Sequence, residues 1–161
     1  MQDSSNMLAY IDVLYYPNGT FYGATAARLV VTNDKRLVLT SAEGTPEAPV
    51  YKEIFNVTAG EVRKISLMVD QLTVKLTGKT HRMSVSQYMV PALAAGGIVG
   101  GAVAYGMEKK SGAAKFVAVL RSLGIPVSHM GIGKLYGISA LIALALIAAI
   151  ALGVYLFGGA S

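Results

Sequence analysis

The sequence contains no cysteine, so neither a disulfide framework nor a thiolate metal site is possible. Charged residues make up only 14% of the 161 residues and hydrophobic residues 53%, a balance typical of a membrane protein rather than a soluble enzyme. The two histidines, His81 and His129, lie far apart in the chain, and a metal site needs more ligands at closer spacing. We therefore expect no metal and no cofactor.

Catalytic motifs are also lacking. The sequence has no Gly-x-Ser-x-Gly element. Residues 131–134 resemble a fragment of a phosphate loop, but they lack its upstream glycine and the Ser or Thr after Lys134. His81 alternates with Arg82 in a predicted strand, and we expect it at the surface. The sequence predicts no catalytic residue and no enzyme.

The longest uncharged run covers residues 135–157. A helix of this length rises about 34 Å, and the hydrocarbon core of a bilayer is about 30 Å thick. Tyr136 and Tyr155 lie near its ends, where aromatic rings favour the headgroup level. The alternative is the core helix of a soluble domain, but a domain this small cannot cover such a helix on all sides. We predict a transmembrane helix.

The position and flanking charge of this run predict a tail anchor. The N-terminus is polar and acidic, without a signal-peptide pattern, and four residues follow the predicted span. Residues 107–134 form a basic segment beside the span, which predicts a membrane surface as partner, rather than nucleic acid, and a cytoplasmic orientation. Its candidate lipid contacts are Lys109, Lys110, Lys115, Arg121 and Lys134.

A second uncharged run covers residues 89–106 and is rich in Ala and Gly. It is either a flexible connector, a membrane-associated or re-entrant helix, or a second span. Its spacing predicts close helix packing in lipid, because glycines four apart let two helices approach. The candidate packing residues are Gly96, Gly97, Gly100 and Gly101.

Residues 1–88 read as an antiparallel β domain, with six or seven short strands and no helix between them. We expect a loop at residues 42–49, which hold two prolines, two glutamates and a glycine. Alternation predicts inward side chains along the strands. The predicted core positions are Leu29, Val31, Leu37, Leu39, Leu72, Val74 and Leu76. A short amphipathic helix is predicted over 113–123, ending at Gly124 ahead of Pro126.

This order of strands followed by one helix resembles the pleckstrin-homology (PH) superfold, in particular the GRAM and bacterial PH-like domains. The residues that carry the likeness are 27–39, similar to a strand–turn–strand element of those domains, 72–79, similar to their late hairpin, and 116–127, similar to their closing helix. The resemblance implies an α+β fold, an antiparallel PH-like barrel or sandwich with a capping helix, to which the transmembrane helix is added.

The resemblance also implies where a ligand binds, since lipid-binding PH domains place basic residues around the first hairpin loop. Residues 16–20 would be that loop, and they contain none. Arg28, Lys35 and Arg36 are the nearby candidates for headgroup or partner contacts. We expect a non-enzymatic, membrane-anchored module that binds a partner protein or an anionic lipid surface. The alternative is a small accessory subunit of a larger membrane complex, packed against partner spans through the glycines.

Overall fold

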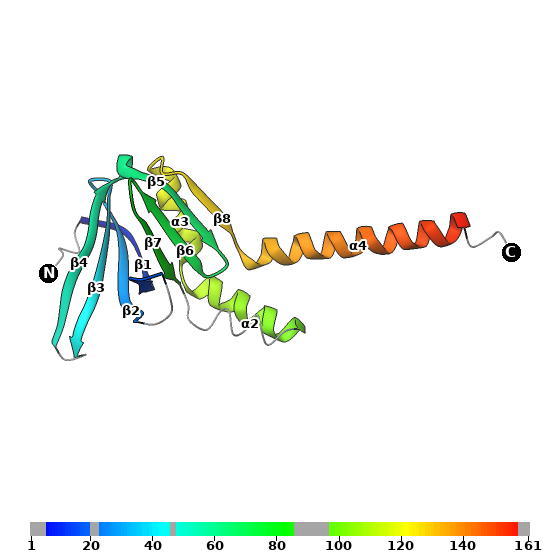
Figure 1. Ribbon diagram of the computed structural model, residues 1–161, viewed down its shortest axis with the longest axis horizontal. Helices are drawn as coiled ribbons and strands as arrows, with labels where there is room; N and C mark the ends of the chain where they lie inside the picture. The colour runs from blue at the N-terminus through cyan, green and yellow to red at the C-terminus, as the bar shows by residue number, and fades with distance from the viewer. Residues whose placement is uncertain (1–5, 20–22, 46–47, 86–96, 158–161) are drawn as a thin grey trace.

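The computed structural model describes residues 6–19, 23–45, 48–85 and 97–157 (Figure 1). Within these residues the chain is α+β, with eight strands and three α-helices. The elements are β1 (Met7–Tyr16), β2 (Thr25–Thr32), β3 (Arg36–Thr45), β4 (Ala48–Thr58), the 3₁₀ turn η2 (Ala59–Glu61), β5 (Val62–Met68), β6 (Gln71–Leu76), β7 (Thr80–Ser84), α2 (Gly97–Lys110), α3 (Ala113–Ser122), β8 (Val127–Met130) and α4 (Ile132–Phe157).

All eight strands belong to one sheet, in the order β4-β3-β2-β1-β7-β6-β5-β8. Two antiparallel meanders, β1–β4 and β5–β7, meet where β1 pairs with β7. The predicted α+β class and mostly antiparallel sheet are confirmed; in place of the predicted barrel or sandwich, the described residues form one open sheet, whose two edges are β4 and β8. The described strands within residues 1–88 pair with one another only in antiparallel fashion. Val127–Met130 lies beyond that boundary and adds β8 parallel to β5.

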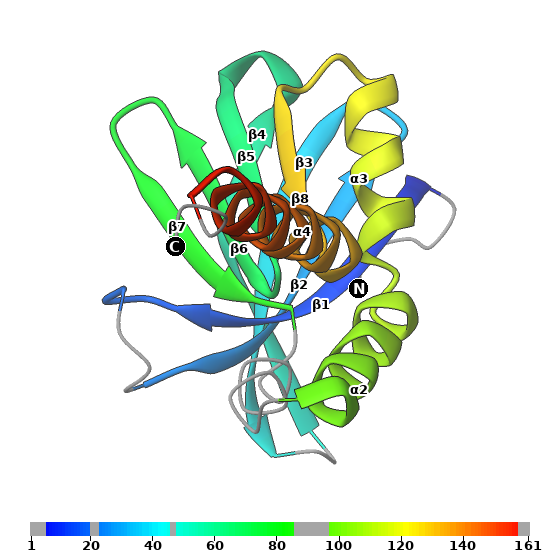
Figure 2. The same cartoon turned by 90° about the vertical axis from the view of Figure 1, so that its right-hand side faces the viewer.

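The inner faces of both meanders share one hydrophobic core, covered by α3 (Figure 2). Alternating residues of β2, β3 and β6 fill it, which confirms the predicted core except at one position. Leu29, Leu37 and Leu39 are fully buried, whereas Leu76 near the end of β6 is only partly buried. Burial of such apolar side chains is the main favourable contribution to folding.

The predicted loop at residues 42–49 is wrong, because β3 and β4 continue as a paired hairpin on both sides of residues 46–47. Proline normally interrupts a ladder because it lacks an N–H donor. Pro49 is tolerated because β4 is an edge strand, with a neighbour on one side only.

The helix predicted at 113–123 is observed as α3, and its apolar stripe faces the core. Phe116 and Leu120 are fully buried within it. Gly124 adopts a φ of +77°, and its N–H donates to the carbonyl of Arg121 while that of Ile125 donates to Leu120. These two hydrogen bonds end the helix in the left-handed conformation that glycine adopts without strain.

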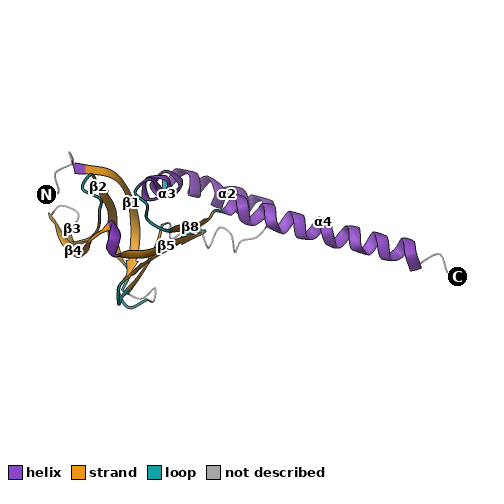
Figure 3. Ribbon diagram, turned by 90° about the horizontal axis from the view of Figure 1, so that it is seen from above, coloured by secondary structure: helices purple, strands orange, loops and turns teal. Residues whose placement is uncertain are grey.

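The C-terminal helix α4 begins at Ile132, three residues before the predicted start of the span. Its apolar stretch Ile132–Tyr155 has a mean hydropathy of 2.6 and is the one helix of the described residues long and apolar enough to cross a membrane. No residue from Gly133 to Tyr155 is buried, and Figures 1 and 3 show α4 projecting away from the sheet. A helix that exposes apolar side chains along most of its length is favoured in an apolar surrounding.

Candidate functional site

The joint between the sheet domain and α4 is built around Glu108, near the C-terminal end of α2. One carboxylate oxygen, Oε2, accepts a hydrogen bond of 2.9 Å from the backbone N–H of Ile132, the first residue of α4. The other, Oε1, lies 3.5 Å from Nε2 of His129. A carboxylate is favourable here because the N-terminus of a helix carries partial positive charge. Glu108 therefore ties α2 to the start of the apolar helix.

Glycine makes this contact possible. A Cβ at Gly131 would overlap the carboxylate of Glu108, and one at Gly101 would overlap the ring and hydroxyl of Tyr136. The earlier residue of α2, Gly101, contacts the later residue of α4, Tyr136, and Glu108 contacts Ile132. The start of α4 therefore runs antiparallel to α2. Gly101 and Gly100 are both buried, whereas Gly96 falls outside the described residues and Gly97 is the first residue of α2.

The predicted lipid contacts divide between this joint and α3. Lys109 and Lys110 end α2, and Lys134 lies in the first turn of α4, so the Glu108 contact brings these three exposed cations to the same joint. The ammonium of Lys109 lies 4.9 Å from the ring centre of Tyr105. Lys115 and Arg121 are exposed on α3, and Arg121 lies at the end of α3 distant from α2.

The three candidates suggested by the family resemblance lie on β2, β3 and the turn between them. Nε of Arg28 donates to Asp12 at 2.6 Å, and its guanidinium lies 4.4 Å from the ring centre of Tyr10. The hydrogen bond to Asp12 raises the pKa of Arg28. Nε of Arg36 donates to the side chain of Asn56 at 2.7 Å. Arg28 and Arg36 thus already have partners within the domain.

Lys35, the third of these candidates, occupies the β2–β3 turn with a φ of +59°. Its carbonyl accepts a 2.9 Å hydrogen bond from the N–H of Ala59. This bond ties the turn to the end of β4. The structure gives Lys35 a role in the backbone of the turn, and its side chain is exposed.

The expectation that His81 lies at the surface is wrong, because its side chain is 2% exposed. In the ladder between β6 and β7, His81 stands opposite Val74, so it shares the inward face. Its Nδ1 lies 3.2 Å from the hydroxyl of Tyr15, and its ring packs on Phe55 with centres 4.7 Å apart. Burial lowers the pKa of His81. An enclosed, hydrogen-bonded histidine contributes to the core and cannot reach a substrate in solvent.

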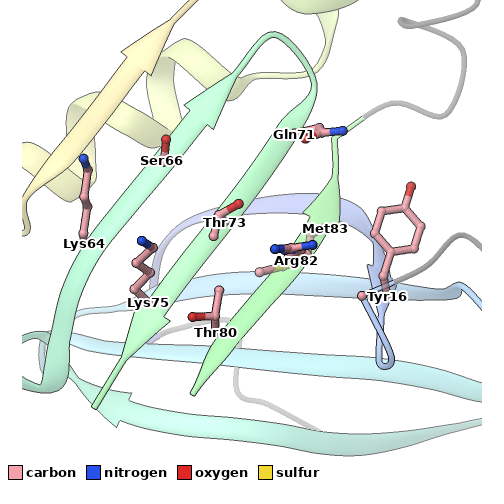
Figure 4. Close-up of a pocket in the computed structure, with 10 residues that line it drawn as sticks. Tyr16, Lys64, Ser66, Gln71, Thr73, Lys75, Thr80, Arg82 and Met83 are labelled. Atoms are coloured by element: carbon pink, nitrogen blue, oxygen red, sulfur yellow. The ribbon is translucent and has the colours of Figure 1, made fainter. Parts of the chain in front are cut away.

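The outer face of β5–β7 carries a hollow of about 620 Å³ that was not predicted from the sequence (Figure 4). Three cations line it: Lys64 of β5, Lys75 of β6 and Arg82 of β7. The alternation of side chains along each strand does place these three cations on the outer face, since each is next in sequence to a residue that points into the core. Reading these residues as one surface requires the strand register, which places Lys64 opposite Lys75.

The described residues contain no group of three or more His, Asp or Glu side chains arranged to hold a metal ion. In comparisons with known proteins, no family model and no curated protein matches the chain.

Proposed function

We propose that the chain is a non-enzymatic, membrane-anchored module in which α4 crosses the bilayer and holds a PH-like sheet domain at an anionic lipid surface. The observation that carries the proposal is the exposed apolar length of α4, attached directly to the folded domain through the Glu108 joint. The short β8–α4 connection, Gly131 alone, keeps the domain close to the membrane.

The strand topology supports the PH-like part of the proposal. Seven strands form two antiparallel meanders that meet at β1 and β7, and a helix after the last of them packs into the core. The chain differs from that plan in two additions, α2 before the capping helix and the parallel strand β8 after it. Strand β8 leads into α4 and α2 packs against its start, so we interpret both as the adaptation that joins this domain to a membrane helix.

The packing of α3 supports a single crossing. Phe116, Val117 and Leu120 are buried in the same core as the strands, so α3 and the sheet lie on one side of the membrane. A connection that crossed once at residues 89–106 would separate them. Two crossings do not fit into 18 residues, since each needs about 20 in a helix. Residues 89–96 are outside the described part of the chain.

The basic joint supports an anionic surface on the cytoplasmic side. Lys109, Lys110 and Lys134 meet where α4 leaves the domain, which is the level of the headgroups if α4 spans. Each basic side chain near an anionic surface contributes about 1 kcal/mol, and such residues favour the cytoplasmic side of a span. The alternative of an accessory subunit packed through the glycines is less well supported, because Tyr136 of the same chain already covers Gly101.

Membrane insertion is tested by removing residues 135–161 and extracting the membranes with alkaline carbonate. The full chain is expected in the membrane pellet, and the shortened chain in the soluble fraction. A shortened chain that stays in the carbonate-resistant pellet would show that another segment is the anchor.

Orientation is tested by single-cysteine labelling, which is clean because the chain has no native cysteine. Asp34→Cys and Ser122→Cys replace exposed residues on the β2–β3 turn and at the end of α3. In intact cells, an impermeant maleimide is expected to leave both unlabelled. Labelling of both would reverse the orientation, and labelling of one alone would contradict the single crossing.

A further inference from the structure

The hollow on the outer face of β5–β7 is formed by two cross-strand rows of polar side chains. The register places Lys64, Lys75 and Thr80 opposite one another in one row. The second row is formed by Ser66, Thr73 and Arg82. Figure 4 shows the side chains of these residues on the same face of the sheet. The face is opposite to the one that α3 covers, because Ile65, Val74 and Met83 of the same strands point into the core.

The row that contains two lysines is energetically unfavourable without a further group. Like charges directly opposite each other on a sheet destabilise it. Among the described residues, no acidic side chain forms an ion pair with Lys64, Lys75 or Arg82. Three cations are therefore held around one hollow without a direct ion pair to an acidic side chain of the described residues. This arrangement favours a bound anion.

The shape and donors of the hollow indicate which anion. Its volume of about 620 Å³ falls in the range of small-molecule sites, about 300–1,000 Å³. Arg82 presents a planar fork that suits two oxygens of a phosphate, and lysines add point charge. Ser66 and Thr73, both partly buried, contribute hydroxyl donors between the cations. A phosphate monoester presents up to two negative charges and three strong acceptor oxygens, which matches this set.

We propose that this hollow binds a small phosphate-bearing ligand, with its phosphate group between Lys64, Lys75 and Arg82. The group can belong to a phosphomonoester lipid headgroup or to a soluble phosphate ester, because the recognising chemistry is the same. The proposal goes beyond the membrane-anchored module proposed above and does not depend on it, since the hollow lies within the sheet domain and includes no residue of α4.

The test uses the full chain in nanodiscs and measures the midpoint of thermal unfolding by circular dichroism. In the first arm the nanodiscs contain only phosphatidylcholine, and inorganic phosphate or glycerol 3-phosphate is added at constant ionic strength against chloride. In the second arm, nanodiscs with phosphatidic acid are compared with phosphatidylglycerol nanodiscs of equal surface charge. A ligand that binds only the folded state raises the midpoint in a saturable way.

The decisive variant is Lys64→Gln with Lys75→Gln, and its matched control is Arg28→Gln with Arg36→Gln, which removes two charges from the other half of the sheet. The hollow variant is expected to weaken the apparent affinity by about tenfold or more, as the loss of charge-assisted hydrogen bonds predicts. The control is expected to retain the wild-type affinity. The midpoints in chloride alone check that both variants fold.

A saturable rise in the first arm identifies a soluble phosphate ligand, and a rise with phosphatidic acid alone identifies a lipid headgroup. Either supports the proposal if the hollow variant weakens the apparent affinity by about tenfold or more while the control variant keeps it. The proposal is overturned if neither arm raises the midpoint above its charge-matched reference. It is equally overturned if the hollow variant responds like wild type or the control variant loses the response. A negative result in this experiment does not contradict the proposed membrane anchor, because membrane insertion is tested separately by carbonate extraction.

Discussion

The two halves of the sheet, β1–β4 and β5–β7, both expose cationic side chains, but the bonding partners of these side chains differ. On β1–β4, Arg28 is bound by Asp12, and Arg36 by Asn56. On β5–β7, Lys64, Lys75 and Arg82 surround a hollow, and the described residues give them no acidic ion-pair partner. Arg28 and Arg36 of the first half are therefore committed to the fold, whereas Lys64, Lys75 and Arg82 of the second half can meet a ligand. Net charge alone does not distinguish the two surfaces, since the difference lies in their partners.

The largest expected effect on stability is the same in both halves of the sheet, because the two halves share one hydrophobic core beneath these surfaces. Leu39 of β3 and Leu72 of β6 are 0% and 1% exposed. Truncation of a buried leucine to alanine costs about 2–5 kcal/mol, so Leu39→Ala and Leu72→Ala are each expected to lower the free energy of unfolding by that amount. Urea unfolding of the full chain in detergent measures it.

Leu76→Ala is the control within β6, because Leu76 is only partly buried. It is expected to cost clearly less than Leu72→Ala. Equal losses at Leu72 and Leu76 would contradict the observed burial. A large loss at Leu39 with none at Leu72 would show that the halves unfold separately.

This core was largely predictable from the sequence, and the hollow was not. Alternation of side chains within one strand identifies Leu29, Leu37 and Val74 as inward without knowledge of any neighbour. The hollow depends on which strand lies beside which. The same limit explains the error at His81, which is polar by composition but lies opposite Val74 in the ladder. Strand β8 was missed because four residues after a helix carry too little pattern.

The joint at α4 was also predicted only in part, because its helix can be recognised from one segment whereas its contacts involve two. The apolar run identifies the helix by its own composition, and Gly101 was a candidate by spacing. The specific contacts of Glu108 with Ile132 and of Gly101 with Tyr136 depend on how α2 folds back along α4. Glu108 was visible only as the single acid of a basic segment, which gave no indication of its partner.

The second expected effect concerns the place where the halves meet. His81 of the second half contacts Phe55 of the first and Tyr15 of β1. Its pKa is lowered from 6.5 by burial, so below about pH 6.5 the unfolded chain binds a proton that the folded chain does not. Stability is therefore expected to fall as the pH decreases from 7.5 to 5.5. Thermal midpoints of the wild type and of His81→Gln measure this contribution.

His81→Gln keeps a hydrogen-bonding group beside Tyr15 and does not titrate, so its midpoint is expected to change less over this range. Asp70 acts with the opposite sign, because burial raises its pKa and the folded state then gains stability as the pH falls. Its contribution is present in both proteins and cancels in the comparison. An identical pH dependence in the two proteins would refute the role assigned to His81.

A smaller effect is expected from the paired cations of the first half. Asp12→Ala removes the partner of Arg28, a pair in which the two side chains are 49% and 63% exposed. Exposed ion pairs contribute about 0.2–1 kcal/mol and are screened by salt. We expect a loss of stability within that range at low salt and a smaller one at 1 M NaCl, measured by urea unfolding. A loss that persists unchanged in high salt would indicate packing on Tyr10 rather than charge.

The smallest expected effect has the opposite sign and tests the comparison most directly. Lys75→Thr removes one of two like charges that face each other across β5 and β6, and threonine suits a strand better than lysine. In phosphate-free buffer at low salt, the variant is expected to be as stable as wild type or more stable by a few tenths of a kcal/mol, the low end of such cross-strand effects.

Arg28→Thr is the matched change in the first half, and it is expected to lower stability because Arg28 has a partner to lose. Adding inorganic phosphate should reverse the order of Lys75→Thr and wild type, since only wild type keeps the full set of cations to bind it and gain stability by mass action. A destabilised Lys75→Thr variant in phosphate-free buffer would mean that Lys75 supports the fold. The two halves of the sheet would then use their cations in the same way.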